Sequence, residues 1–296
     1  MIATSSAAPL RWTAQLSRRR GLPRPLRRFL RHRPAAISAL IIVIYLVAAA
    51  FAPLLTARDP LDMSAGPRLY PPNPVHWFGT DEYGRDIFTR VLFGARIALT
   101  VGLSSSLIAC CIGSAIGLLA GYMGGLVDRV ISMAIDLVFA FPTILLAIAL
   151  AVFMNPSMQT VIVALAIVQS PHFARVIRAA ILSTKQQPYV ESAILVGAGH
   201  RRIIRFHLLP NVASPIIVQV ALSLSYAVLS ESALSFLGVG NPPPAPSWGA
   251  MLSGAYGYVE QAPWAAVFPG LAITFFILAF NMLGDGLQDL LDPTRR

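Results

Sequence analysis

The sequence contains no group of residues with the types and spacing that catalysis requires. No nucleophile–base pair is evident, and no Gly-x4-Gly-Lys-Ser/Thr phosphate loop is present. The five histidines are scattered, and His200 and His207 lie beside three arginines, which disfavours a metal site. We therefore predict that the chain is not an enzyme, does not bind or hydrolyse ATP itself, and holds neither a metal nor a cofactor.

The longest polar interruption between apolar spans in the second half of the chain is Glu191–Asn211. Pro188 suits the first turn of a short helix that precedes Gly197 and Gly199, and glycine is the usual residue where a chain turns with φ > 0. We expect a second short helix to follow, limited by Pro210. It would carry apolar side chains on one side and basic side chains between them, namely Ile203, Ile204, Leu208, Arg201, Arg202 and Arg205.

The pattern E-S-A-x3-G followed by L-L-P resembles the EAA loop of permease subunits in ATP-binding-cassette (ABC) importers. In that family the loop is cytoplasmic, and its short helix docks into a groove on the ATPase subunit. Serine stands here in place of the commoner second alanine. The resemblance implies an ATPase-coupling role for Glu191, Ser192, Ala193, Ile194, Leu195, Gly197, Ala198, Gly199, His200, Arg201 and Ile204. The alternative is an ordinary amphipathic loop between membrane helices.

The composition places the chain in a membrane. Hydrophobic residues make up 56% of the 296 residues and charged residues only 12%, whereas soluble proteins carry about a quarter charged residues. The net charge of +10 is concentrated, because nine arginines lie between Arg11 and Arg33 without an acidic residue among them. Ahead of a membrane span this cluster is a positive-inside signal rather than a nucleic-acid site, so we expect the bilayer, and no nucleic acid, as a partner.

Six apolar spans are expected in an all-α polytopic fold. An arginine-rich cytoplasmic tail (1–34) precedes an uncleaved first helix, because its apolar core exceeds that of a signal peptide. About 20 apolar residues cross a bilayer core. Pro142 should kink the third span, and the fourth should run into Pro171. The spans are roughly 35–55, 97–120, 130–153, 158–170, 215–237 and 265–283.

The segment 56–96 is polar and nearly neutral, with five acidic residues and five arginines, so it suits the side opposite the tail. The spacing allows ion pairs at i, i+4 between Asp81 and Arg85 and between Asp86 and Arg90. We interpret these four residues as a salt-bridged cap on the outer mouth. The stretch G-T-D-x-x-G-R-D-x-x-T-R-x-x-x-G-A-R resembles the dipeptide/oligopeptide/nickel permease family, and 97–296 would be the core permease domain, with the coupling loop at about 186–211.

Three polar residues lie in or near the later spans and are candidates for the pore. Asp136 is near the start of the third span, Glu231 towards the far end of the fifth, and Asn281 at the end of the sixth. A carboxylate inside a membrane should face protein or water. For Glu231 a structural hydrogen bond is favoured over translocation, and for Asn281 capping and packing are favoured.

Charge and helix count agree on topology. With the N-terminus in the cytoplasm, four spans return the chain to that side at 172–207, where six basic residues accompany Glu191 alone. Two further spans leave the C-terminus in the cytoplasm as well. The expected location is the bacterial inner membrane.

The resemblance implies a type I ABC importer permease with six transmembrane helices. It implies a heterodimer with a second, homologous permease, two ABC ATPase subunits and an extracytoplasmic substrate-binding protein. Closing of the ATPases on ATP would carry the coupling loops and open the pore outward. Di- or oligopeptides are the favoured cargo, with nickel or another small solute as the alternative. Two rival classes are a secondary transporter driven by an ion gradient and a membrane scaffold.

Overall fold

The computed structural model describes residues 33–291, and every element in this part of the chain is helical. The arginine-rich tail lies outside the described residues. The elements are α2 (Arg33–Leu55), α3 (Ile87–Met123), α4 (Gly125–Phe139), α5 (Thr143–Phe153), α6 (Met158–Lys185), α7 (Pro188–Leu195), α8 (His200–Ile203), the π-helical η1 (Ile204–Leu208), α9 (Leu209–Phe236), α10 (Trp248–Ala255), the 3₁₀ turn η2 (Tyr256–Tyr258) and α11 (Trp264–Leu291).

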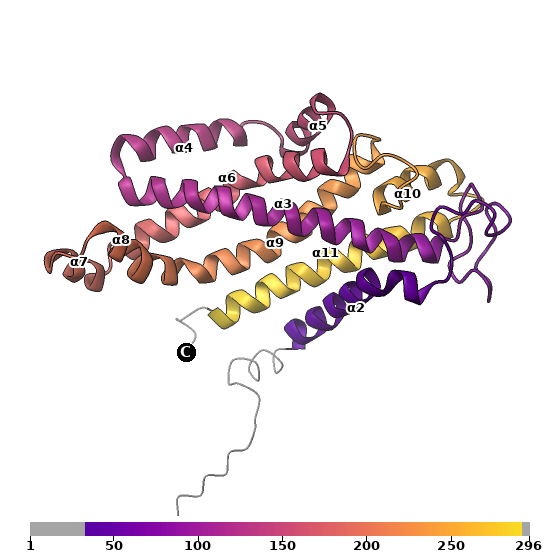
Figure 1. Cartoon of the computed structure of the whole chain (residues 1–296), viewed down its shortest axis with the longest axis horizontal. Coiled ribbons are helices and arrows are strands. Elements are labelled where there is room, and N and C mark those ends of the chain that lie inside the picture. The colour runs from indigo at the N-terminus through magenta and orange to yellow at the C-terminus, as the bar shows by residue number, and fades with distance from the viewer. Residues whose placement is uncertain (1–32, 292–296) are drawn as a thin grey trace, which may run out of the picture.

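Five helical segments within 33–291 are long and apolar enough to cross a membrane, and the bent pair α4–α5 makes a sixth. The long helices run side by side (Figure 1). The short helices α7 and α8 lie at one end of this bundle, and α10 with the 56–86 segment lies at the other. The start of α2 and the end of α11 point towards the end that carries α7 and α8. The all-α polytopic fold predicted from the sequence is thus confirmed.

Glycines on one face of α3 allow it to pack closely on α6. A Cβ atom on Gly113 or Gly117 would overlap the carbonyl oxygen of Ser170 or Ala174, and one on Gly121 would lie 2.9 Å from Ile181 Cγ2. Small residues at this spacing let helix backbones approach in a membrane. The pair α3–α6 therefore packs backbone against backbone.

Proline positions misled the prediction of helix ends. The helix α6 was expected to end near residue 170 but continues through Pro171 to Lys185. Pro171 has no N–H for the carbonyl of Ile167, and the Ser170 hydroxyl donates to that carbonyl instead, at 2.9 Å. The hydrogen bond lost to proline is thereby replaced.

Pro210 also failed to end a helix. The π turn η1 shifts the register, so that the N–H of Leu209 donates to the carbonyl of Ile204. Pro210 then occupies the first turn of α9, where it needs no N–H partner. The third span, by contrast, breaks more sharply than a kink, because α4 and α5 meet at 87° around Pro142.

One further boundary differs from the sequence prediction, at the end of the bundle opposite α7 and α8. The helix α3 begins at Ile87, ten residues before its expected start, because Asp86 caps it by accepting a hydrogen bond from the Thr89 N–H at 2.9 Å. The segment between α9 and α11 contains α10, whose Trp248 is buried and donates from Nε1 to the carbonyl of Val91 at 3.0 Å. This bond ties α10 to α3.

Candidate coupling surface and transmembrane cavity

The two short helices predicted from the sequence form the segment between α6 and α9. Pro188 lies in the first turn of α7, and Gly197 follows its end with a φ of +84°. The N–H of Ala198 donates to the Ala193 carbonyl at 3.0 Å, and the N–H of Gly197 to the Ile194 carbonyl at 2.9 Å. This is a Schellman motif, which ends α7 with its last carbonyls satisfied.

The segment is fixed firmly to the bundle. Its buried side chains pack with Ile177 and Ile181 of α6 in one cluster, which also contains Val190, Ile203, Leu208 and Val212. At the end of α3, the Tyr122 hydroxyl lies 2.5 Å from His200 Nδ1, and Lys185 Nζ donates to the Tyr122 carbonyl at 2.9 Å. The segment is therefore in contact with α6, α9 and α3.

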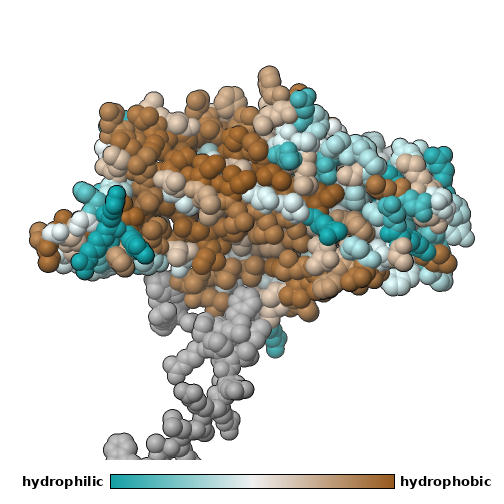
Figure 2. Space-filling view, viewed as in Figure 1, coloured by the Kyte–Doolittle hydropathy of each residue, from teal (hydrophilic) through white to brown (hydrophobic). Residues whose placement is uncertain are grey.

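The opposite side of α7 is apolar and open. Leu195 is 85% exposed, Val196 is 89% exposed and Ile194 is 48% exposed. The helix α7 lies at the left end of Figure 1, and Figure 2 shows hydrophobic surface at that end. The exposed Glu191 lies on the same helix. We call the residues Ile194, Leu195 and Val196 the apolar tip. Val196 was not among the predicted coupling residues, although it directly precedes Gly197, which was among them.

Basic side chains stand next to the apolar tip. Arg201, Arg202 and Arg205 line an open cavity with Phe206 and His207. None of these arginines has an acidic partner among residues 33–291. Among the predicted coupling residues, Ala193, Ala198 and Ile204 are half-buried, and Ser192, Gly199, His200 and Arg201 are exposed. Ile203 is buried in the internal cluster, so its side chain is not exposed for contact with a partner.

At the end of the bundle opposite α7 and α8, one predicted ion pair is confirmed. Arg85 Nε lies 2.7 Å from Asp81 Oδ2, and both side chains are buried. The backbone N–H groups of Tyr83 and Arg85 also donate to Asp81, each at 2.9 Å. Asp81 therefore closes a turn as well as pairing with arginine.

The second predicted pair, between Asp86 and Arg90, is wrong. Because Asp86 caps α3, its carboxylate turns away from Arg90, and its Oδ1 lies 2.8 Å from His76 Nδ1 and 3.1 Å from Arg58 Nη1. Arg90 instead donates from Nη1 to the Pro60 carbonyl at 2.9 Å. Arg90 Nε also lies 3.5 Å from Asp81 Oδ2. Partners nine or more residues away, as these are, cannot be read from local i, i+4 spacing.

The three candidate pore residues lie in different surroundings. Glu231 is 1% exposed, and its Oε1 accepts a hydrogen bond from Ser235 at 2.8 Å. Asp136 is exposed, and its Oδ1 accepts from Arg175 of α6 at 2.8 Å. Asn281 alone lines a cavity within the described bundle. The role of these residues in a pore stays a prediction.

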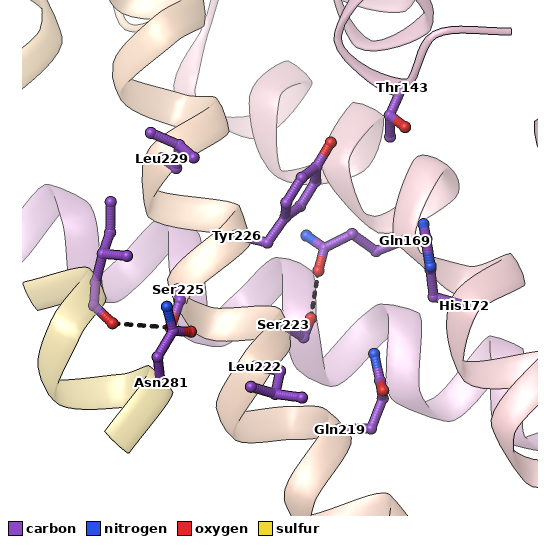
Figure 3. A pocket seen from close by; sticks show the side chains of 11 residues that line it. Thr143, Gln169, His172, Gln219, Leu222, Ser223, Ser225, Tyr226, Leu229 and Asn281 are labelled. Atoms are coloured by element: carbon purple, nitrogen blue, oxygen red, sulfur yellow. Dashed lines mark hydrogen bonds between the residues drawn. The ribbon is translucent and has the colours of Figure 1, made fainter. Parts of the chain in front are cut away.

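That cavity, of about 370 Å³, lies between α5, α6, α9 and α11 (Figure 3). Its polar lining consists of amides, hydroxyls and one imidazole, and it includes no Asp, Glu, Lys or Arg. Side chains with amide and hydroxyl groups can both donate and accept hydrogen bonds. The lining residues are Thr143, Gln169, His172, Gln219, Leu222, Ser223, Ser225, Tyr226, Leu229, Ile277 and Asn281.

Comparison with known proteins accounts for this arrangement. Residues 113–296 match the family described as binding-protein-dependent transport system inner membrane component, and residues 25–72 match the N-terminal transmembrane domain of oligopeptide transport permease C. The chain belongs to this permease family. The predicted resemblance is confirmed, and the chain is the non-catalytic, multi-pass membrane component of a bacterial ABC transport system.

Named relatives of this permease cover most of its length. It is 43% identical to the dipeptide transport system permease protein DppC of Alkalihalophilus pseudofirmus, over 89% of this chain and 86% of the relative. It is 44% identical to the glutathione transport system permease protein GsiD of Escherichia coli O6:K15:H31, over 90% and 88%. A putative peptide transport system permease of Brucella abortus is 41% identical, over 90% of each chain.

A solved structure has the same fold. The permease resembles a chain in inward-facing conformations of the MetNI methionine ABC transporter, with a TM-score of 0.59 and 18% identity. The match covers 69% of this permease and 97% of that chain. Membership in a binding-protein-dependent system implies ATPase and binding-protein partners.

Proposed function

We propose that this permease forms half of the path for di- or oligopeptides in an ATP-driven importer of the bacterial inner membrane. A second, homologous permease completes the path, two ABC ATPase subunits drive it, and an extracytoplasmic binding protein delivers the cargo. The observation that carries this proposal is the apolar tip, which is exposed on one side of a segment whose other side is fixed to three transmembrane helices.

The tip has the properties of a docking surface. Isolated exposed apolar residues are ordinary, but three consecutive ones beside a glycine turn, with Glu191 and three arginines nearby, can supply both apolar contact and ion pairs to a partner. A partner that moves the tip moves α6 and α9 with it. This coupling turns the closing of an ATPase pair into a rearrangement of the helices around the cavity.

Peptide cargo is supported by the relatives, whose names refer to dipeptide, peptide and glutathione transport. The uncharged polar lining of the cavity agrees with cargo that is passed on rather than held tightly. Both ends of the described chain point to the end that carries α7, which supports a cytoplasmic N-terminus and C-terminus (Figure 1).

The test is uptake by the complete importer in proteoliposomes, with Leu195→Asp as the variant and Leu195→Met as the matched control. Because Leu195 is 85% exposed, the aspartate should leave the chain folded but weaken ATPase docking. We expect at least a tenfold loss of ATP-driven peptide uptake and of co-purified ATPase for Leu195→Asp, and near-normal values for Leu195→Met. Uptake without ATPase subunits would contradict the proposal in favour of a secondary transporter. Ni²⁺ uptake in place of peptide uptake would contradict the proposal that the cargo is a peptide.

A further inference from the structure

A second cavity continues the first along α9. It has a volume of about 590 Å³ and lies between α6, α9 and the end of α11. Gln219 and Leu222 line both cavities, so the two are adjacent. The second cavity extends to Asn211 and Ser214, near the coupling segment, and to Gln288 of α11. Together they form a track from the middle of the bundle to the end that carries α7.

One face of α9 forms the floor of this track. The residues that line it recur every three or four positions, as side chains on one face of a helix must. From Asn211 to Leu229 the face extends over ~27 Å, given a rise of 1.5 Å per residue, which is close to the ~30 Å of a bilayer core. The α9 residues of the track are Pro210, Asn211, Ser214, Pro215, Val218, Gln219, Leu222, Ser223, Ser225, Tyr226 and Leu229.

The chemistry of the track is uncharged. No Asp, Glu, Lys or Arg lines either cavity. Its amides come from three helices: Gln169 of α6, Asn211 and Gln219 of α9, and Asn281 and Gln288 of α11. A peptide bond offers one donor and one acceptor, and a side-chain amide offers the same pair. The track therefore complements a peptide backbone and makes little distinction between acidic and basic cargo.

One donor in the wall of the track lacks a partner. Gln169 is 3% exposed, and its Oε1 accepts a hydrogen bond from the Ser223 hydroxyl, which is itself linked to Ser106 of α3 at 2.9 Å. Its Nε2 has no hydrogen-bond partner within the described chain, and Figure 3 shows this nitrogen directed towards Tyr226. A buried donor without an acceptor costs about 1–3 kcal/mol. A carbonyl that reached it would remove this cost.

We propose that this track is the peptide-contacting surface of the permease and that its amides bind the backbone of a short peptide in transit. The inference rests on the proposed function, because peptide is the assumed cargo. Gln169 supplies a donor, Gln219 and Asn281 supply donors and acceptors from facing helices, and Tyr226 covers the Gln169 donor until cargo arrives.

The experiment uses the complete importer in proteoliposomes, with Cys110→Ser and Cys111→Ser as the background. Gln219→Cys and Asn281→Cys place a thiol in the track on two separate helices. Ile217→Cys is the matched control, because Ile217 lies two residues from Gln219, is 46% exposed and lines neither cavity. The probe is the anionic thiol reagent 2-sulfonatoethyl methanethiosulfonate, applied during ATP turnover with and without a saturating dipeptide.

We expect the adduct at position 219 or 281 to lower dipeptide uptake at least tenfold, and dipeptide to slow labelling there at least threefold. The adduct at position 217 should change uptake by less than twofold. The proposal is overturned if adducts in the track leave uptake unchanged, if dipeptide does not alter labelling, or if neither track position is labelled. Dipeptide uptake by the unlabelled background complex tests the proposed function separately. If this complex takes up no dipeptide, both the proposed function and peptide as the ligand are contradicted.

Discussion

Gly117 of α3 lies directly against the backbone of Ala174 of α6, so closely that a methyl group at Gly117 would overlap the Ala174 carbonyl oxygen. The same contact recurs one turn earlier, between Gly113 and Ser170. The helix pair is thus joined by backbone against backbone, an arrangement that side-chain repacking cannot relieve.

Gly117→Ala should therefore destabilise the permease. Overpacking of a tight interface typically costs about 1–3 kcal/mol, which lowers the midpoint of thermal unfolding. Gly270→Ala is the control, because Gly270 lies inside α11 with no atom within 4 Å of its added Cβ. Thermal unfolding of the purified permease, followed by a thiol-reactive fluorophore, measures both. Equal midpoints for the two variants would show that α3 and α6 can separate without cost.

Gly197→Pro should uncouple ATP hydrolysis from uptake. Proline cannot adopt the φ of +84° found at Gly197, so the Schellman turn must open and α7 must change its angle. Gly199→Ser is the control, because Gly199 has a φ of −67° with open space around it and serine suits the cap of α8. We expect peptide-stimulated ATPase activity and uptake to fall at least tenfold for Gly197→Pro only. Normal values for both quantities would refute a coupling role for this turn.

Glu231→Gln should retain uptake, whereas Glu231→Ala should not. Glutamine keeps the oxygen that accepts from Ser235, but alanine leaves a buried cavity and an unpaired hydroxyl, at a cost of about 2–4 kcal/mol. Uptake and thermal stability of both variants measure this. If Glu231→Gln folds normally and loses uptake, the carboxyl group itself is needed for transport, and an ion-driven mechanism would gain support.

Glu82→Gln should change how stability depends on pH. Burial raises the pKa of Glu82 above its ordinary value of 4.5, even though Arg85 lies 3.4 Å away. The folded protein therefore holds this proton more tightly than the unfolded chain, and stability falls as pH rises from the unfolded pKa to the folded one. We expect Glu82→Gln to unfold at a higher temperature than the parent at pH 7, with the difference vanishing below the unfolded pKa.

Asp62→Asn is a control of opposite sign. The Ser64 side-chain hydroxyl and backbone N–H lower the pKa of the exposed Asp62, so its contribution is present at neutral pH and is lost as pH falls. If Glu82→Gln and Asp62→Asn shift the pH profile in the same direction, the desolvation of Glu82 is not the cause.

Local sequence was sufficient where one turn of chain determines the structure. Pro188 and Gly197 fixed the bounds of α7, and Asp81 paired with Arg85 as their spacing predicted. Local sequence was insufficient where a partner far away in the chain determines the structure. Pro171 would end a helix in isolation but does not, because Ser170 satisfies the freed carbonyl. Asp86 faces Arg58 and His76 rather than Arg90.

The polar track illustrates the same limit. Gln169, Ser223 and Ser106 come from three different helices. Ser223 lies 54 residues after Gln169 and 117 residues after Ser106. No periodicity within one span reveals that these side chains meet. The candidate pore residues chosen for their charge or position, Asp136 and Glu231, lie outside the track, whereas neutral amides form it.

The near-continuous helix from His200 to Phe236 has a mechanical consequence. Its 37 residues give a rod of ~55 Å at 1.5 Å per residue, well beyond the ~30 Å of a bilayer core. This rod reaches from the transmembrane bundle to His200, next to the segment that carries the apolar tip. A tilt of ~10° about the Phe236 end would move the His200 end by ~10 Å, given the same rise per residue. A small rotation of the helices around the cavity would then accompany a large displacement at the His200 end.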